Sequence, residues 1–152
     1  MFSGKSSLNL DSKGRLAIPS RYRARLEEMS ESDVVVTINP LDRCVWIYPR
    51  TEWEIIEAKL RQLSDFDKQS RRTKQMMLGY AEDFHLDSHG RIRIPSSLKE
   101  YAGLEKEAVM LGQGNKFELW DESAWNTQHD EWLASLEDTS GEPSEPLQQL
   151  SL

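Results

Sequence analysis

The sequence predicts an α+β fold with a mainly β core, built from two tandem, pseudo-symmetric β-hairpin–helix–β-hairpin repeats with extra helices. The segments LDSKGRLAIPS (10–20) and LDSHGRIRIPS (86–96) agree at eight of eleven positions, 76 residues apart. An internal repeat determines the architecture before any single element is considered. Apolar and polar residues alternate on both sides of a glycine turn in each copy, which is strand periodicity. We expect the copies to face each other across an approximate two-fold axis.

The first copy begins with a strand–turn–strand segment, in which the alternating apolar residues are Leu8, Leu10, Leu16 and Ile18. Gly14 can adopt the positive φ that a tight hairpin turn requires. Asp11 can accept hydrogen bonds from the amides that follow it and so close the turn. With residues 12–14 as the loop, Asp11 and Arg15 face each other, and their opposite charges set the register.

The remaining elements follow the same order in both copies. After Pro19 we expect a helix over 20–28, then a β-hairpin of strands 34–38 and 44–48. The second copy predicts strands 84–86 and 91–94, a helix over 96–101, and strands 109–111 and 117–120.

Helices join and follow the two copies. An apolar stripe at helical spacing predicts a helix over 51–63, a second helix reaches Tyr80, and a final helix covers 121–136. We therefore divide the chain into a first repeat with its following helix (1–63), a linking helix (64–80), a second repeat with the C-terminal helix (81–136) and a tail (137–152). The acidic tail contains Pro and Gly and no Lys or Arg, a composition that predicts disorder.

The charge distribution is more informative than the net charge of −7. Residues 130–152 carry six acidic side chains and no Lys or Arg, so residues 1–129 have a net charge of −1. Residues 1–25 contain six cations and only one acid, Asp11. Because a local patch decides phosphate binding, this segment is a candidate for contact with a polyanion.

Other classes of protein find little support in the chain. It has no apolar run long enough to span a membrane and no signal peptide, and its single Cys44 fits a reducing compartment, so we expect a cytoplasmic protein. His85, His89 and His129 lack the spacing of metal ligands. No nucleophile–His–acid set or phosphate-binding loop is evident. We expect no enzyme activity, metal, cofactor, small-molecule substrate or membrane partner.

The doubled Asp-x-x-x-Arg turn, the segment YPRTEWEIIE (48–57) and the segment NKFELWD (115–121) together resemble the bacterial MraZ family. The resemblance covers about residues 1–126, and the three segments occur in the family's order. That family belongs to the AbrB/SpoVT/MazE-like superfamily of swapped-hairpin DNA-binding proteins.

The resemblance implies a double-split β-barrel of the AbrB-like kind and a sequence-specific DNA-binding transcriptional regulator, mainly a repressor. It further implies a homo-oligomeric ring that binds short repeated promoter sites in double-stranded DNA, upstream of the division and cell-wall operon that the regulator itself heads. A nucleoid location follows from that role. The same superfamily includes antitoxins, so an alternative is a protein-interaction module that uses the tail, with Leu147, Leu150 and Leu152 as anchors.

The candidate DNA-binding residues are Lys13, Arg15, Arg21, Arg25 and Arg91, and the residues that shape or orient the turns are Asp11, Gly14, Asp87 and Gly90. Arg can pair with guanine in the major groove, and Lys supplies a flexible charge. Arg15 could instead serve only to hold the turn with Asp11. Arg21 and Arg25 are like charges at i and i+4, which fits an anionic partner or a solvated face. His89 replaces Lys13 in the second copy and leaves it less basic.

Overall fold

The computed structural model describes residues 1–138 and 141–151. The chain forms two compact units, Met1–Glu122 and Ser123–Leu152. Within the described ranges, no helix is both long and apolar enough to cross a membrane. Each unit is considered by itself below.

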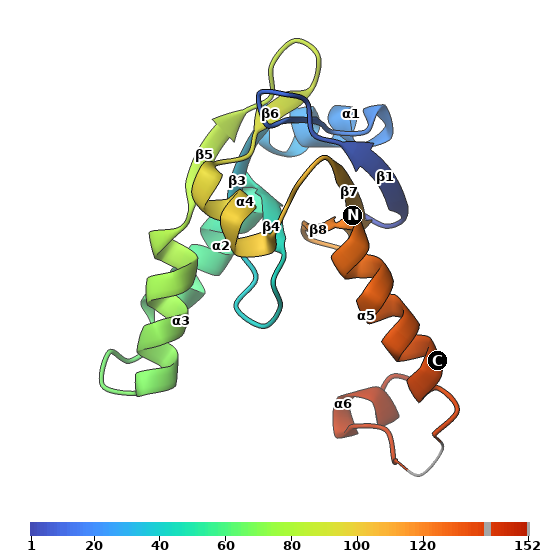
Figure 1. Cartoon of the computed structure of the whole chain (residues 1–152). Helices are drawn as coiled ribbons and strands as arrows, with labels where there is room; N and C mark the ends of the chain where they lie inside the picture. The colour runs from blue at the N-terminus through green and yellow to red at the C-terminus, as the bar shows by residue number, and fades with distance from the viewer. Residues whose placement is uncertain (139–140, 152) are drawn as a thin grey trace. The chain divides into compact units, whose positions relative to one another are not determined.

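The first unit has the predicted α+β composition, with every expected strand and helix present (Figure 1). The first copy contributes β1 (Lys5–Asn9), β2 (Arg15–Ala17), α1 (Ser20–Ser30), β3 (Asp33–Ile38), β4 (Val45–Pro49) and α2 (Arg50–Arg61). Helix α3 (Lys68–Gly79) leads to the second copy, with β5 (Glu82–His85), β6 (Arg91–Arg93), α4 (Ser96–Ala102), β7 (Glu107–Gly112) and β8 (Phe117–Asp121). Pro19 and Pro95 stand immediately before α1 and α4, and Gly103 ends α4 in the left-handed conformation.

The strands are exchanged between the two copies. The main sheet has the antiparallel order β1-β7-β8-β4-β3-β5, so each edge strand pairs with a strand of the other copy. Strands β2 and β6 form a separate antiparallel ribbon. This pairing corrects the expectation of a self-paired hairpin at residues 8–18. Asp11 N–H donates to the Arg15 carbonyl at 2.9 Å, but β1 and β2 then form their ladders with the other copy.

The closed double-split β-barrel that the resemblance implies is not observed among the described residues. Strands β1 and β5 are edges of an open six-stranded sheet, and the ribbon is a sheet of its own. The change of partner occurs at each Asp-x-x-x-Arg turn, where one ladder ends and another begins. The short strand that follows is only three residues long.

The core belongs to both copies at once. Leu16 and Ile92, paired across the ribbon, are buried, as are Ile18 and Ile94 at the strand ends. Such sharing is expected, because a half of this size alone buries too little apolar surface. Burying Leu16 and Ile92 together requires β2 and β6 to lie against each other, which explains the exchange.

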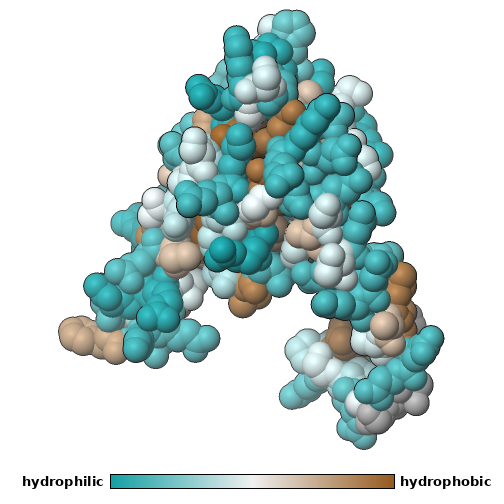
Figure 2. Space-filling model, in the orientation of Figure 1, coloured by the Kyte–Doolittle hydropathy of each residue, from teal (hydrophilic) through white to brown (hydrophobic). Residues whose placement is uncertain are grey.

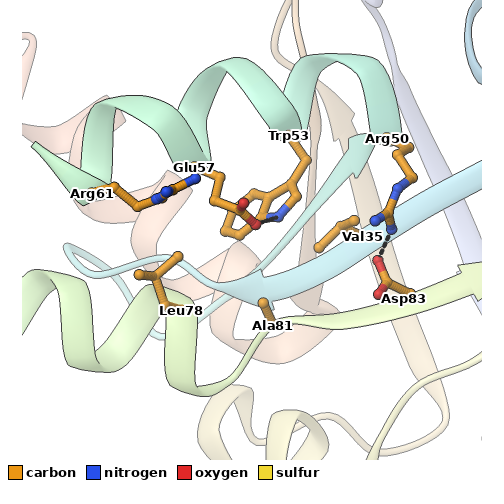
Figure 3. A pocket seen from close by; sticks show the side chains of 8 residues that line it. All are labelled: Val35, Arg50, Trp53, Glu57, Arg61, Leu78, Ala81 and Asp83. Atoms are coloured by element: carbon orange, nitrogen blue, oxygen red, sulfur yellow. Dashed lines mark hydrogen bonds and ion pairs between the residues drawn. The ribbon is translucent and has the colours of Figure 1, made fainter.

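Helix α2 attaches the first copy to the edge strand of the second. Trp53 is buried, and its Nε1 donates to Glu57 Oε2 at 3.1 Å. Arg50 forms an ion pair with Asp83 of β5. A cavity of about 350 Å³ lies between these two contacts, as Figure 3 shows. The ion pair therefore adds a polar link to the exchange of strands.

The second unit contains most of α5 (Glu122–Ser135) and α6 (Glu145–Gln148). The apolar side chains of the final helical segment differ in burial: Trp125 is buried, whereas Trp132, Leu133 and Leu136 are exposed. Helix α6 lies inside the predicted tail, of which residues 139, 140 and 152 lie outside the described residues. The disorder of residues 137–152 stays a prediction.

The shared core gives a stability prediction. Replacing Leu16→Ala, which has 0% exposure, should lower the free energy of unfolding by about 2–5 kcal/mol because it removes contacts to both copies. Leu41→Ala, at 84% exposure, is the matched control and should change it by less than about 0.5 kcal/mol. Urea unfolding at one fixed chain concentration measures both. Equal effects would contradict a core shared at the ribbon.

Candidate nucleic-acid interface

The first turn is closed by the carboxylate of Asp11. Its Oδ1 accepts hydrogen bonds from the backbone N–H groups of Lys13 at 2.9 Å and Arg15 at 2.8 Å. Its Oδ2 accepts from Nε of Arg15 at 2.7 Å. One acid thus holds both the backbone of the turn and the guanidinium that follows it, while Lys13 remains exposed.

The second turn repeats this arrangement with nearly the same geometry. Asp87 Oδ1 accepts from the N–H groups of His89 at 2.8 Å and Arg91 at 2.9 Å. Its Oδ2 accepts from Nε of Arg91 at 2.9 Å. The predicted roles of Asp11 and Asp87 in shaping the turns therefore have a clear geometric basis.

These hydrogen bonds change the acidity of both carboxyl groups. The backbone N–H of Arg15, followed by its guanidinium, lowers the pKa of Asp11. The corresponding donors of Arg91 lower the pKa of Asp87 to about 2. Both groups are ionised near neutral pH, so each arginine is oriented before any ligand arrives.

The ribbon places several arginines on one exposed face. Side chains alternate along a strand, so the burial of Leu16 and Ile92 turns their neighbours outward. Arg15 pairs directly with Arg93, and Ala17 pairs with Arg91. Like charges opposite each other are destabilising in a sheet, unless an anion lies between them. Figure 2 shows that hydrophilic side chains largely cover this end of the first unit.

Each turn is also tied to the opposite copy through its glycine. Gly14 and Gly90 have φ of +75° and +70°, in the left-handed region, which the sequence predicts for Gly14. The Gly14 carbonyl accepts from Ile94 N–H at 3.0 Å, and the Gly90 carbonyl accepts from Ile18 N–H at 2.8 Å. The two turns therefore flank one ribbon.

Two helical cations lie over these glycines. A Cβ at residue 14 would lie 3.4 Å from Nζ of Lys99 on α4, and a Cβ at residue 90 would overlap with the guanidinium of Arg23 on α1. The helix of each copy thus covers the turn of the other copy.

The side chains of Arg21 and Arg25 contact the N-terminal segment and not the two turns. Arg21 donates to Ser6 Oγ at 2.7 Å, and its guanidinium lies 4.7 Å from the centre of the Tyr22 ring. Arg25 donates to the Met1 carbonyl. Both side chains contact the N-terminal segment rather than the turns, so their part in DNA binding stays a prediction.

Sequence reasoning did not single out Arg23 and Lys99 as binding residues, although a signal was available. The two positions are 76 residues apart, so the duplication equates them, and both copies carry a cation there. By contrast, the counterparts of Arg21 and Arg25 are Ser97 and Tyr101. Retention of charge in both copies marks the positions that cover the turns.

Within the part of the chain that the structure describes, no group of three or more His, Cys, Asp or Glu could hold a metal ion.

Burial raises the pKa of the Cys44 thiol, with a further contribution from the negative charge of Glu118.

Comparison with known proteins agrees with the duplication. The family model of the MraZ protein, described as antitoxin-like, matches residues 1–76 and again residues 77–142. The chain belongs to the MraZ family. The two matches place one Asp-x-x-x-Arg turn in each half, in agreement with the resemblance seen in the sequence.

Relatives align with this chain over nearly their whole length. A protein of Thioalkalivibrio sulfidiphilus is 49% identical over 100% of both chains. One of Halorhodospira halophila is 47% identical over the same share, and one of Pseudomonas syringae pv. tomato is 48% identical over 95% of this chain and 96% of the relative. Each of the three is named "Transcriptional regulator MraZ".

The turn chemistry predicts a specific acid response. A lowered pKa means that the Asp87 carboxylate stabilises the fold fully above its unfolded pKa of about 3.9, and that this contribution is lost as the pH falls toward about 2. Asp87→Asn should therefore flatten the pH dependence of the free energy of unfolding between about pH 4 and pH 2. Urea unfolding across this pH range measures the effect, with Glu28→Gln on α1 as the control for loss of one charge. An unchanged profile in Asp87→Asn would contradict the bonding described.

Proposed function

We propose that this chain is a transcriptional regulator, and not an enzyme, that binds double-stranded promoter DNA through the β2–β6 ribbon and its two turns. The observation that carries the proposal is the pair of Asp–Arg turns on either side of a ribbon whose exposed face holds Arg15, Arg91 and Arg93. The names of the relatives support the regulatory role.

The dimensions and chemistry of the ribbon suit B-DNA. The major groove admits a two-stranded β-ribbon, and an arginine can donate two hydrogen bonds to a guanine there. Asp11 engages Arg15 through Nε, which leaves the terminal nitrogens of the guanidinium for a base edge. The exposed Lys13 then lies at the turn, where a phosphate of the backbone can be reached.

The negative net charge does not oppose this role. Charges separated by more than about 8 Å are largely screened at physiological ionic strength, so the local field at the ribbon governs contact with DNA. Among residues 1–138 and 141–151, Lys13 and Arg93 make no ion pair within the chain. Their charges are therefore available to phosphate.

The family resemblance extends the proposal to a homo-oligomeric ring. One subunit presents few cations, so its own affinity is modest, but several linked subunits on tandem sites gain greatly in avidity. We propose that the ring occupies short repeated sites upstream of its own division and cell-wall operon, blocks polymerase access as a repressor, and is associated with the nucleoid.

A second candidate function concerns the tail. Leu147 and Leu150 are exposed in and just after α6, and the matching family model is described as antitoxin-like. These leucines could anchor a partner protein, with Leu152 as the third anchor named from the sequence. This function would use a different part of the chain from the ribbon.

The central prediction concerns Arg15. Arg15→Ala should weaken binding to a fluorescein-labelled duplex from the chain's own upstream region at least tenfold, because a good bidentate base contact contributes about 1–3 kcal/mol at each engaged site. Fluorescence anisotropy measures the affinity. Arg72→Ala, an exposed arginine on α3, is the matched control and should bind as wild type does. Equal affinity of Arg15→Ala and wild type would refute this contact.

The tail prediction separates the two candidate functions. Deleting residues 137–152 removes four carboxylates and no cation, so affinity for the same duplex should be kept or slightly raised. A pull-down with the full chain and the shortened chain tests the second function. Loss of a captured partner together with intact DNA binding would support it, and loss of DNA binding would contradict the ribbon as the sole DNA contact.

A further inference from the structure

We infer that each DNA-binding turn is completed by a cation from the helix of the opposite copy, Lys99 for the first turn and Arg23 for the second. The inference rests on the proposed function, since it names further residues of the same interface. It makes the two turns one binding unit instead of two independent loops.

Lys99 reaches the first turn across the boundary between the copies. Its Nζ and Cδ lie 3.4 and 3.7 Å from the point that a Cβ of residue 14 would occupy, so its side chain lies along Gly14. Among residues 1–138 and 141–151, it has no acidic partner. A half-buried stem with an unpaired ammonium beside an exposed turn is suited to a phosphate.

Arg23 is held more firmly over the second turn. Its Nε donates to the Ile18 carbonyl at 2.7 Å, and the N–H of Ile18 donates to the Gly90 carbonyl at 2.8 Å. The backbone of Ile18 therefore holds both the guanidinium and the glycine that it covers. The terminal nitrogens of Arg23 have no acidic partner within the described ranges, and their donors can point to a phosphate.

These crossing cations add one positive charge to each turn, and the two turns differ in the other cations near them. The second copy has His89 where the first has Lys13, and it has Arg93 where the first has Ala17. The register of the ribbon places Arg93 opposite Arg15, beside the first turn, and Ala17 opposite Arg91, beside the second. With the helical residues included, the first turn has Lys13, Arg15, Arg93 and Lys99 near it, and the second has Arg91 and Arg23. Arg23 is thus one of only two Arg or Lys side chains at the second turn among the described residues, so its contribution weighs more there than that of Lys99 at the first.

The principal test measures the salt dependence of binding. The full-length chain and its variants are titrated against the fluorescein-labelled upstream duplex over a range of salt concentrations. Lys99→Gln and Arg23→Gln should each reduce the slope of log K against log salt by about 0.9 per engaged subunit. At about 0.1 M salt this corresponds to roughly eightfold weaker binding per subunit. Lys68→Gln and Arg72→Gln on α3 are the matched controls, and their slopes should equal that of wild type.

A second pair of variants separates displacement of a cation from strain in the turn. Gly14→Ala and Gly90→Ala both place a side chain at positive φ and should weaken the turns similarly. A Cβ at residue 14 makes ordinary contact with Lys99, but one at residue 90 displaces Arg23. Gly90→Ala should therefore lose about 0.9 more of the salt slope per subunit than Gly14→Ala.

The outcomes distinguish this inference from the proposed function. If Arg15→Ala loses binding while Lys99→Gln and Arg23→Gln keep the wild-type affinity and slope, the crossing cations are excluded and the proposed function stands. If wild type fails to bind any duplex, both are wrong. Arg23→Lys is used if Arg23→Gln does not fold, because it keeps the positive charge. Its slope of log K against log salt should equal that of wild type. A reduced slope would count against the inference.

Discussion

The carboxylate that closes each Asp-x-x-x-Arg turn is the interaction on which the proposed DNA interface depends. With three hydrogen bonds it sets the path of the backbone and the direction of the guanidinium. Because the acid engages Nε, it orients the arginine without occupying the terminal nitrogens. The lowered pKa of both acids means that this orientation is present near neutral pH in the protein alone. In the proposed DNA complex, the entropy of ordering the arginine would therefore be lost on folding and not on binding.

The exchange of strands joins the two copies into one folded unit that carries both turns. β1 and β5 each extend the sheet through a strand of the other copy, and the ribbon joins the copies at their turns. Neither half can place its turn without the other, since the glycine of each turn is bonded to the opposite strand. The same exchange brings Arg15 opposite Arg93. Repulsion between these two positive charges lowers the stability of the ribbon, and an anion bound on that face would relieve it.

Much of the interface could be predicted from the chain. Asp11 and Gly14 were identifiable because an acid and a glycine at that spacing have a turn chemistry of their own. Local pattern could not identify Arg23 and Lys99 as residues that cover the turns, because each lies on a helix far in sequence from the turn that it covers. Arg21 and Arg25 looked equally suitable on the same helix, and only the packing of α1 against the N-terminal segment separates them from Arg23.

The sequence by itself determined the duplication, the α+β composition, the two turns and the family, since each depends on residues close together in the chain or on a direct match between segments. Tertiary structure alone decided which strands pair, that the main sheet stays open, and which cations lie over the turns. Those features depend on the apolar side chains that the two copies bury against each other. Leu16 of one copy and Ile92 of the other, for example, are buried as a pair across the ribbon. Such a choice is made by non-local packing, which no periodicity along the chain encodes.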